Sequence, residues 1–360
     1  MSAIGLPVLA SNQKQYKYVV SILNDLVPKP FRKGIQLYRG GFDREEPATE
    51  RVISGIVKEE VPDDFIINLH APFITKTVLP EYNFTSEKVK SMVSKNISLA
   101  ESINARSLTI HFNTLFYHPE RLSDPSIPQI DFDLFKWKSK WDSYPFVKKE
   151  VIDVAYNILK EIAESTKIKI SVENMPIPLI GDIHKYPMSL VYDPKLNTYE
   201  SIIEFLEEFS NFKNIGLCFD AAHYKLVQVT LNPLVKEYGN NLNYGIMKSK
   251  GFLGLYPERF SLQPDINTVV KRLISKNVLF DLQVADAGKK WIKDLQLLEE
   301  GLPMYNNDFG KELLKMLKYT VENSPDTFVS FDIEERDYLN RQNQINSLKM
   351  FFNYLSSKNL

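Results

Sequence analysis

The chain has 360 residues, of which 44% are hydrophobic and 25% are charged, a composition typical of a folded globular protein. This composition excludes a disordered or fibrous chain, and the length suits either two ordinary domains or one large α/β barrel. Its 44 basic and 45 acidic residues nearly balance and form no long run of like charge. Nucleic acid is therefore a less favoured partner than a small molecule.

Cys218 is the only cysteine, and it lies in an apolar run, so the chain can form neither an internal disulfide framework nor a multi-cysteine zinc site. We expect a buried thiol at this position. No segment approaches the roughly 20 apolar residues of a membrane span, and Met1 to Ser11 lacks a basic region before its apolar run. We therefore expect a cytoplasmic protein without a membrane partner. The sequence leaves open whether it forms a homo-oligomer.

Short apolar runs alternate with longer amphipathic segments along the whole chain. Strands are predicted at Ala3–Ala10, Gly34–Tyr38, Phe65–Leu69, Ser107–Ile110, Ile168–Val172, Ile215–Phe219, Val278–Leu282 and Phe328–Phe331. Helices are predicted at Lys14–Leu26, Ala48–Lys58, Ser86–Ile103, Lys148–Glu164, Thr198–Phe209, Asp265–Lys276, Phe309–Val321 and Leu339–Leu355. This alternation is typical of parallel βαβ units.

Eight strands and eight helices in alternation predict a single-domain (β/α)8 TIM barrel that spans residues 1–360. An open, doubly wound sheet is the alternative architecture. Such a sheet normally carries a glycine-rich phosphate turn after its first strand, and Ala10-Ser11-Asn12-Gln13 is not one. The sequence therefore favours the barrel.

Two long connections interrupt the regular spacing and are predicted insertions, at residues 113–146 and 225–264. The first is rich in proline, aspartate and aromatic residues, and the second carries several glycines. Both follow predicted strands, which places them over the carboxyl-terminal face of a barrel, where active sites lie. Trp137, Trp141 and Tyr144 of the first insertion either cover a substrate or hold a surface loop against the barrel.

Polar side chains follow most of the predicted strands at the point where each strand ends. They are His70, His111, Glu173, Asp220, Gln283 and Asp332. Taken singly, a histidine is often a hydrogen-bonded structural residue, and Asp220 could cap the following helix. Together they converge at one mouth of a parallel barrel, where carboxylates without a cation would repel one another. This ligand set suits a divalent metal such as Zn, Mn, Co or Mg.

The chain resembles the xylose isomerase-like superfamily of TIM barrels along nearly its whole length. The resemblance is carried by His-Ala-Pro at His70–Pro72, His111, Val-Glu-Asn at Val172–Asn174, Asp220-x-x-His223, Gln283-x-x-Asp286 and Asp332. Each motif is short, and their order and their strand-end placement make the combination specific. The superfamily contains metal-dependent sugar isomerases and epimerases and also the endonuclease IV class of repair enzymes.

The isomerase and epimerase branch, which uses a similar Gln-x-x-Asp motif, implies one metal held by Glu173, Asp220, Gln283 and Asp332. Glu173 and Asp332 would then act as acid and base, on a small sugar, a sugar phosphate or a related hydroxy-carbonyl compound. The substrate would be bound by His223, Lys290, Asp286 and Asn174. We take this branch as the leading hypothesis for function.

The endonuclease branch implies a three-zinc cluster and cleavage of a phosphodiester. The first zinc would be held by His70, His111 and Glu173, the second by Glu173, Asp220 and Asp332, and the third by His223, Asp294 and the residue at position 296. The sequence departs from that pattern, because Gln283 and Gln296 stand where histidines are expected and Asp332 stands where glutamate is expected. A third hypothesis is a barrel that binds a ligand without catalysis.

Overall fold

The computed structural model describes residues 2–39, 49–71, 87–111, 113–117, 149–176, 188–192, 196–243, 246, 260–292, 295–335 and 337–357. Only the backbone is described for residues 87–90, 92, 113–117, 149–155, 188–192, 289–292 and 295–299. Most of the first predicted insertion, with Trp137, Trp141 and Tyr144, lies outside the described residues, as do Pro72 and Asp294.

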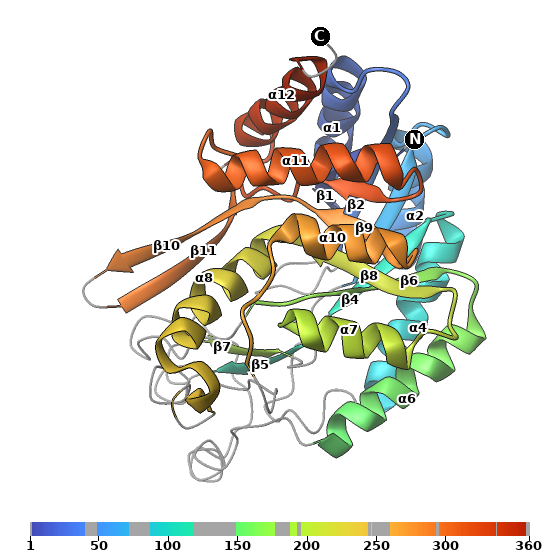
Figure 1. The fold of residues 1–360 in the computed structure, drawn as a ribbon. Coiled ribbons are helices and arrows are strands. Elements are labelled where there is room, and N and C mark those ends of the chain that lie inside the picture. Colours follow the sequence, from blue (N-terminus) through green and yellow to red (C-terminus); the bar gives the residue numbers. More distant parts are fainter. Residues whose placement is uncertain are drawn as a thin grey trace.

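Eight parallel strands close a barrel in the order β1-β12-β9-β8-β6-β4-β3-β2 (Figure 1). They are β1 (Ala3–Leu9), β2 (Arg32–Tyr38), β3 (Ile66–His70), β4 (Ser107–His111), β6 (Lys169–Glu173), β8 (Ile215–Asp220), β9 (Leu279–Gln283) and β12 (Phe328–Ser330). Each lies where the sequence predicts a strand. The (β/α)8 TIM-barrel fold is therefore confirmed.

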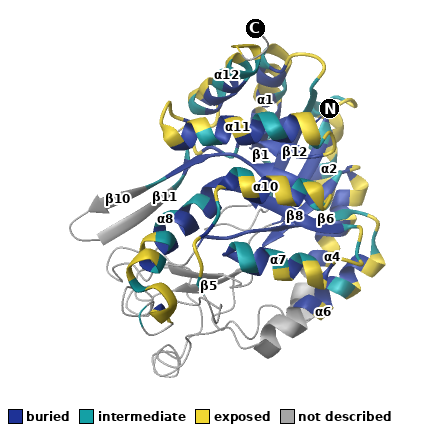
Figure 2. Ribbon diagram, viewed as in Figure 1, coloured by how far each residue is buried: buried dark blue, intermediate teal, exposed yellow. Residues whose placement is uncertain are grey.

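Helices surround the barrel and turn their apolar faces toward it, as the burial pattern in Figure 2 shows. They are α1 (Gln13–Leu26), α2 (Glu50–Glu60), α4 (Glu87–Ser102), α6 (Lys149–Ser165), α7 (Tyr199–Glu208), α8 (Ala221–Tyr238), α10 (Ile266–Ser275), α11 (Asp308–Asn323) and α12 (Gln342–Ser357). Several begin at a polar cap; the side chains of Asn12, Thr49 and Asp265 accept hydrogen bonds from backbone N–H groups of the first turn. Among the described residues, every helix is too short or too polar to cross a bilayer.

Helix α8 corrects the predicted insertion at residues 225–264. Residues Lys225 to Tyr238 are helical, so the prediction that a loop begins at Lys225 is wrong. Asp220 caps this helix, and Leu226, Val227 and Leu231 are buried on it. The glycines that suggested a loop begin only at Gly239, the C-cap, after which the short 3-10 helix η3 (Gly239–Asn241) follows.

Two antiparallel strand pairs, which the sequence did not predict, lie outside the barrel sheet. Strand β5 (Asn113–Tyr117), at the start of the first predicted insertion, pairs with β7 (Met188–Tyr192). Strand β10 (Asp286–Ile292) pairs with β11 (Leu295–Leu302), and this hairpin projects away from the barrel (Figure 1). The end of β11 returns to the barrel mouth and brings Glu300 and Gly301 to it.

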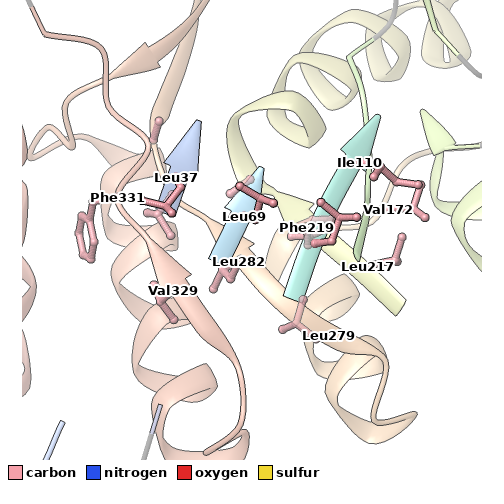
Figure 3. Close-up of a cluster of buried hydrophobic side chains, with 14 of the residues drawn as sticks. Leu37, Leu69, Ile110, Val172, Leu217, Phe219, Leu279, Leu282, Val329 and Phe331 are labelled. Atoms are coloured by element: carbon pink, nitrogen blue, oxygen red, sulfur yellow. The ribbon is translucent and has the colours of Figure 1, made fainter. Parts of the chain in front are cut away.

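The two faces of the barrel strands differ sharply in chemistry. One set of alternate residues, including Leu37, Leu69, Val172 and Phe331, forms the apolar core between the strands and the helices (Figure 3). The other set faces the interior of the barrel and is largely polar: Gln36, Asn68, Thr109, Ser171, Asp281 and Ser330 are all buried. Ser107 of β4 donates to Asp281 of β9 at 3.0 Å, across the interior between strands that are not neighbours.

The amino-terminal end of the barrel is filled by Phe328. A Cβ atom on Gly5 would lie 2.5 Å from the Phe328 ring, and one on Gly34 would lie 2.4 Å from it. The two glycines on β1 and β2 therefore make the space for this ring, which is fully buried. The cavity beside the polar strand ends lies at the opposite, carboxyl-terminal end of the barrel.

Candidate metal centre

Glu173, the last residue of β6, lies at the centre of the polar strand ends. Its Oε2 atom lies 2.9 Å from His70 Nε2 and 2.8 Å from His111 Nε2. The three side chains end β3, β4 and β6, which are consecutive in the barrel, and all three are buried. His70, His111 and Glu173 thus form one group with the spacing of metal ligands.

The hydrogen bond on the other side of the His70 ring fixes its tautomer. His70 Nδ1 lies 3.0 Å from the carbonyl oxygen of Ala71, which only accepts, so Nδ1 carries a proton. In a neutral ring the Nε2 lone pair then faces the Glu173 carboxylate, which is repulsive unless a cation or a second proton lies between them. A backbone carbonyl on Nδ1 is the usual partner of a histidine that ligates metal through Nε2.

The other carboxylate oxygen of Glu173 faces Gln283 and Asp220. The Gln283 amide has two terminal atoms, an oxygen and a nitrogen, whose positions can be exchanged by turning the amide over. The one that faces the carboxylates lies 3.1 Å from Glu173 Oε1 and 3.2 Å from Asp220 Oδ2. If this atom is nitrogen, it donates to both carboxylates. If it is oxygen, three oxygens converge without a proton among them, which is the arrangement that a divalent cation stabilises.

Tyr38 favours the second orientation of Gln283. The Tyr38 hydroxyl donates to Asp332 Oδ2 at 2.6 Å, so its oxygen is left to accept from Gln283 Nε2 at 3.0 Å. Gln36 does not decide between the two orientations, because either terminal atom of its amide can face Gln283 and the other then has no partner. The Tyr38 hydrogen bond thus favours the Gln283 oxygen toward Glu173 and Asp220, and that donor set fits a divalent metal.

His223 lies beside this oxygen set and is held from both ring nitrogens. Its Nδ1 donates to the carbonyl oxygen of Asn174 at 2.8 Å, and its Nε2 lies 3.1 Å from Glu300 Oε2. His223 also forms a group with Glu173 and Asp220 that has metal-ligand spacing. Since both nitrogens face acceptors, the ring is held as a cation, and its pKa is raised well above the ordinary value, with the effect of nearby carboxylates exceeding that of burial.

The carboxylates at the centre have different proton affinities. Burial favours the neutral form of Glu173, but His111 and His70 outweigh burial and lower its pKa below the ordinary range. Burial, with the neighbouring Glu173 charge, raises the pKa of Asp220 to about 7. Burial also raises the pKa of Asp332, against the lowering effect of the Tyr38 hydrogen bond. Asp220 is therefore a carboxylate that would exchange a proton near neutral pH, and Asp332 binds its proton more tightly than an ordinary aspartate does.

A cavity of about 450 Å³ opens beside these residues. Five of the six strand-end residues predicted from sequence line it: His70, His111, Glu173, Asp220 and Asp332. Gln283 lies directly behind them, and Asp332 is two residues beyond β12 and outside both groups with metal-ligand spacing among the described residues. The structure thus brings the six predicted residues together, while their individual roles stay predictions.

The other residues predicted to bind substrate lie in different surroundings. The Asn174 amide donates to the Asp220 carbonyl and accepts from the Asp220 N–H, which joins the ends of β6 and β8. Asp286 accepts from Asn307, the cap of α11, and does not line the cavity. Lys290 and Gln296 belong to the β10–β11 hairpin, with only their backbone described. Substrate contacts by these residues stay predictions.

Sequence reasoning missed Tyr38 and Glu300, which both line the cavity. The Tyr38 ring stacks on His70 with their centroids 4.3 Å apart, in addition to its contact with Asp332. Tyr38 ends a predicted strand, so the rule that found the other strand-end residues would have found it as well. Glu300 comes from the unpredicted hairpin, and no sequence pattern marked it.

No family model matches the chain, and no curated protein matches its sequence. Solved structures match its fold along nearly the whole chain. Mannonate dehydratase from Streptococcus suis serotype 2 has a TM-score of 0.56 at 8% identity and covers 99% of this chain and 95% of its own. A xylose isomerase-like TIM barrel protein from Mycobacterium smegmatis, solved in complex with magnesium, has a TM-score of 0.53 at 11% identity, with 99% and 96% covered.

A D-tagatose 3-epimerase-like protein has a TM-score of 0.50 at 17% identity and covers 100% of this chain and 98% of its own. At these identities the likeness concerns the fold, and the reaction has to be argued from the site. The closed barrel and these structures agree with one another. The chain has the fold of the xylose isomerase-like TIM-barrel proteins.

Proposed function

We propose that the chain is a divalent-metal-dependent isomerase or epimerase that acts on a small sugar or a related hydroxy-carbonyl compound. The observation that carries this proposal is the convergence of the Gln283 amide with the Asp220 and Glu173 carboxylates beside an open cavity. An oxygen-rich set of this kind suits Mn, Mg or Co as well as Zn. Two structural neighbours, an epimerase-like protein and a barrel solved in complex with magnesium, support the same proposal.

Glu173, Asp220 and Gln283 would hold the metal, with Asp332 next to them and His70 and His111 on the far oxygen of Glu173. When bound, a divalent cation polarises a carbonyl or hydroxyl oxygen and makes the adjacent C–H more acidic. Asp332 lines the cavity and has a raised pKa, so it suits the acceptance and return of a proton from carbon. Tyr38 holds this carboxylate in place by its hydrogen bond.

Cleavage of a phosphodiester is the second candidate. It is favoured by one observation: the two groups with metal-ligand spacing share Glu173, so they could hold more than one metal. Against it, the Gln283 amide stands where that chemistry would use an imidazole, and an amide is the poorer zinc ligand. The number of metals per chain separates the two proposals.

The test uses protein reloaded with Mn, Co, Mg or Zn after removal of bound metal. Sugars are incubated with it in D2O, and NMR detects deuterium that enters at the carbon next to the carbonyl, as proton abstraction requires. We expect exchange with the wild-type protein and a loss of roughly 10³-fold or more in Glu173→Gln, together with loss of bound metal in elemental analysis. Glu322→Gln, on an exposed part of α11, is the matched control and should keep both properties.

Other outcomes would favour the alternatives. About three tightly held zinc ions per chain, with cleavage of abasic DNA, would reject the isomerase proposal. Full activity in Glu173→Gln would reject any role of this residue at the metal. Metal binding without exchange on any sugar and without DNA cleavage would support a barrel that only binds a ligand.

A further inference from the structure

The wall of the cavity opposite Glu173 contains Gln15, in the first turn of α1. In the closed strand order, β1 stands four places from β6 in either direction, so the loop after β1 lies across the mouth from Glu173. Gln15 is 8% exposed and still lines the cavity. Its polar group is therefore buried in the protein on one side and open to the cavity on the other.

The orientation of the Gln15 amide is fixed by two donors on its oxygen. The backbone N–H of Leu9 donates to Oε1 at 2.9 Å, and Arg341 Nη2 donates to the same atom at 3.2 Å. The nitrogen of the amide must then point the other way. No residue that the structure describes accepts a hydrogen bond from Gln15 Nε2, which leaves two N–H donors for a molecule in the cavity.

Arg341 holds this arrangement rigidly. Its guanidinium is fully buried and also donates to Pro7 O at 2.7 Å, to Gln344 Oε1 at 2.7 Å and, through Nε, to Tyr338 O at 2.8 Å. None of these acceptors carries a formal charge. The backbone at Arg341 has a positive φ of 49°, a costly conformation for a residue with a side chain. Burial with neutral partners and backbone strain are both unfavourable, which is typical of a residue retained for a site.

The charges around the cavity determine which chemical groups of a ligand can bind to Gln15. Among the described residues that line the cavity, the carboxylates include Glu300 and Glu334, and there is no lysine or arginine. The cationic His223 ring is paired with Glu300, so a phosphate or carboxylate group would meet mainly carboxylates among these residues. An uncharged oxygen is the group that two amide N–H donors can bind in these surroundings.

We propose that Gln15 is a specificity-determining residue, whose amide N–H groups bind an uncharged hydroxyl or carbonyl oxygen at the end of the substrate remote from the metal. The inference rests on the proposed function and favours free sugars or polyols over sugar phosphates as substrates. Arg341 acts through Gln15 and is a positioning residue. The end of the substrate remote from the metal would thus be bound by the Gln15 amide N–H groups, which are neutral donors held in a fixed orientation.

Gln15→Glu is the sharpest variant to test this. It keeps an oxygen acceptor for Leu9 and Arg341 and adds an ion pair to the buried guanidinium, but replaces the N–H donors with a second oxygen. We expect an unfolding midpoint equal to or above that of the wild type. We expect affinity for D-tagatose, D-fructose or D-sorbitol, measured by calorimetry with Mn-loaded protein, to fall at least tenfold, since the substrate oxygen now faces an acceptor.

Gln344→Glu is the matched control. Gln344 also accepts from Arg341, but it is fully buried and does not line the cavity, so the variant adds the same charge without reaching a ligand. Its affinity for the same sugars should stay within about twofold of the wild type, measured below its own unfolding midpoint.

Four results would overturn the inference: equal affinity in Gln15→Glu and wild type, an equal loss in Gln344→Glu, tighter wild-type binding of fructose 6-phosphate than of fructose, or no binding of any probe by the wild type. Failure of the proposed function has a different signature. Sugar binding that depends on Gln15, without deuterium exchange into any bound sugar, would reject the isomerase proposal and keep the role of Gln15.

Discussion

Tyr38 affects the proton affinity of Asp332 through one hydrogen bond. The Tyr38 hydroxyl donates to Asp332 at 2.6 Å and accepts from Gln283, so one side chain links the proposed base to a proposed metal ligand. Burial raises the pKa of Asp332, and the Tyr38 hydrogen bond opposes that rise. The proton affinity of Asp332 therefore depends on this hydroxyl.

Tyr38→Phe should move the pH dependence of activity. Without the hydroxyl, the pKa of Asp332 rises further, so a higher pH is needed to ionise the base. We expect the acidic limb of the kcat profile to shift upward by about one pH unit, which corresponds to the loss of one hydrogen bond to a carboxylate. The measurement is deuterium exchange into a bound sugar from pH 5 to pH 9.

Tyr305→Phe, at an exposed tyrosine, is the control and should leave the profile unchanged. An unshifted acidic limb in Tyr38→Phe would show that Asp332 does not set it. An acidic limb that moves to lower pH would contradict the expected rise in the pKa of Asp332.

Single residues at the candidate site were predictable where position in the strand decided their place. Glu173 and Asp220 end apolar strands, and parallel strands end at one mouth, so their meeting follows from alternation alone. Glu300 reaches the same cavity from a hairpin whose return to the barrel no local pattern indicates. The Gln15 amide is oriented by Arg341, which is 326 residues away in the chain.

At the scale of elements, the strands were easier to predict than the long connections. The outward face of each strand is continuously apolar because a helix covers it, and this signal survives a polar interior face. Helix α8 was missed because the region after β8 was read from its later glycines, although Leu226, Val227 and Leu231 bury one side of it. The glycines mark where that helix ends.

The fit of β1 and β2 around Phe328 gives a prediction for stability. Gly5→Ala would place a methyl group 2.5 Å from the Phe328 ring and 2.8 Å from the Gly34 carbonyl oxygen. We expect the free energy of unfolding to fall by about 1–3 kcal/mol, the usual cost of overpacking a core. Chemical denaturation measures it.

Gly55→Ala is the control within the same chain. Gly55 is exposed in the middle of α2, with nothing within 4 Å of an added Cβ atom. There the substitution should stabilise the protein by about 0.5–1 kcal/mol, because alanine is the better helix former. Equal effects of the two substitutions would mean that the space beside Gly5 is not as tight as the structure indicates.

At the scale of the whole molecule, metal binding should couple to folding and to pH. The proposed ligands come from β6, β8 and β9, so a cation joining them binds only the folded chain. The pKa of Asp220 is raised to about 7, which means that below this pH the metal must displace a proton. Metal affinity should therefore fall as pH is lowered through 7.

The expected result is a rise in melting temperature on addition of Mn²⁺ that is large at pH 8 and shrinks toward pH 5.5. Each unit below pH 7 should weaken binding up to tenfold for one displaced proton. Differential scanning fluorimetry at several metal concentrations measures this, and Glu173→Gln should show little Mn²⁺-dependent rise at any pH. A rise that is the same at pH 5.5 and pH 8 would reject Asp220 as a ligand that binds in its charged form.

The ring of Phe328 has a consequence for how substrate and product would share the cavity. Because the ring fills the amino-terminal end of the barrel, the cavity beside Glu173 lies at the carboxyl-terminal end, where Gln15 and Glu300 are among the described residues that line it. Under the proposed function, a product that accumulates would occupy the same cavity and compete with the substrate, which would slow the forward reaction.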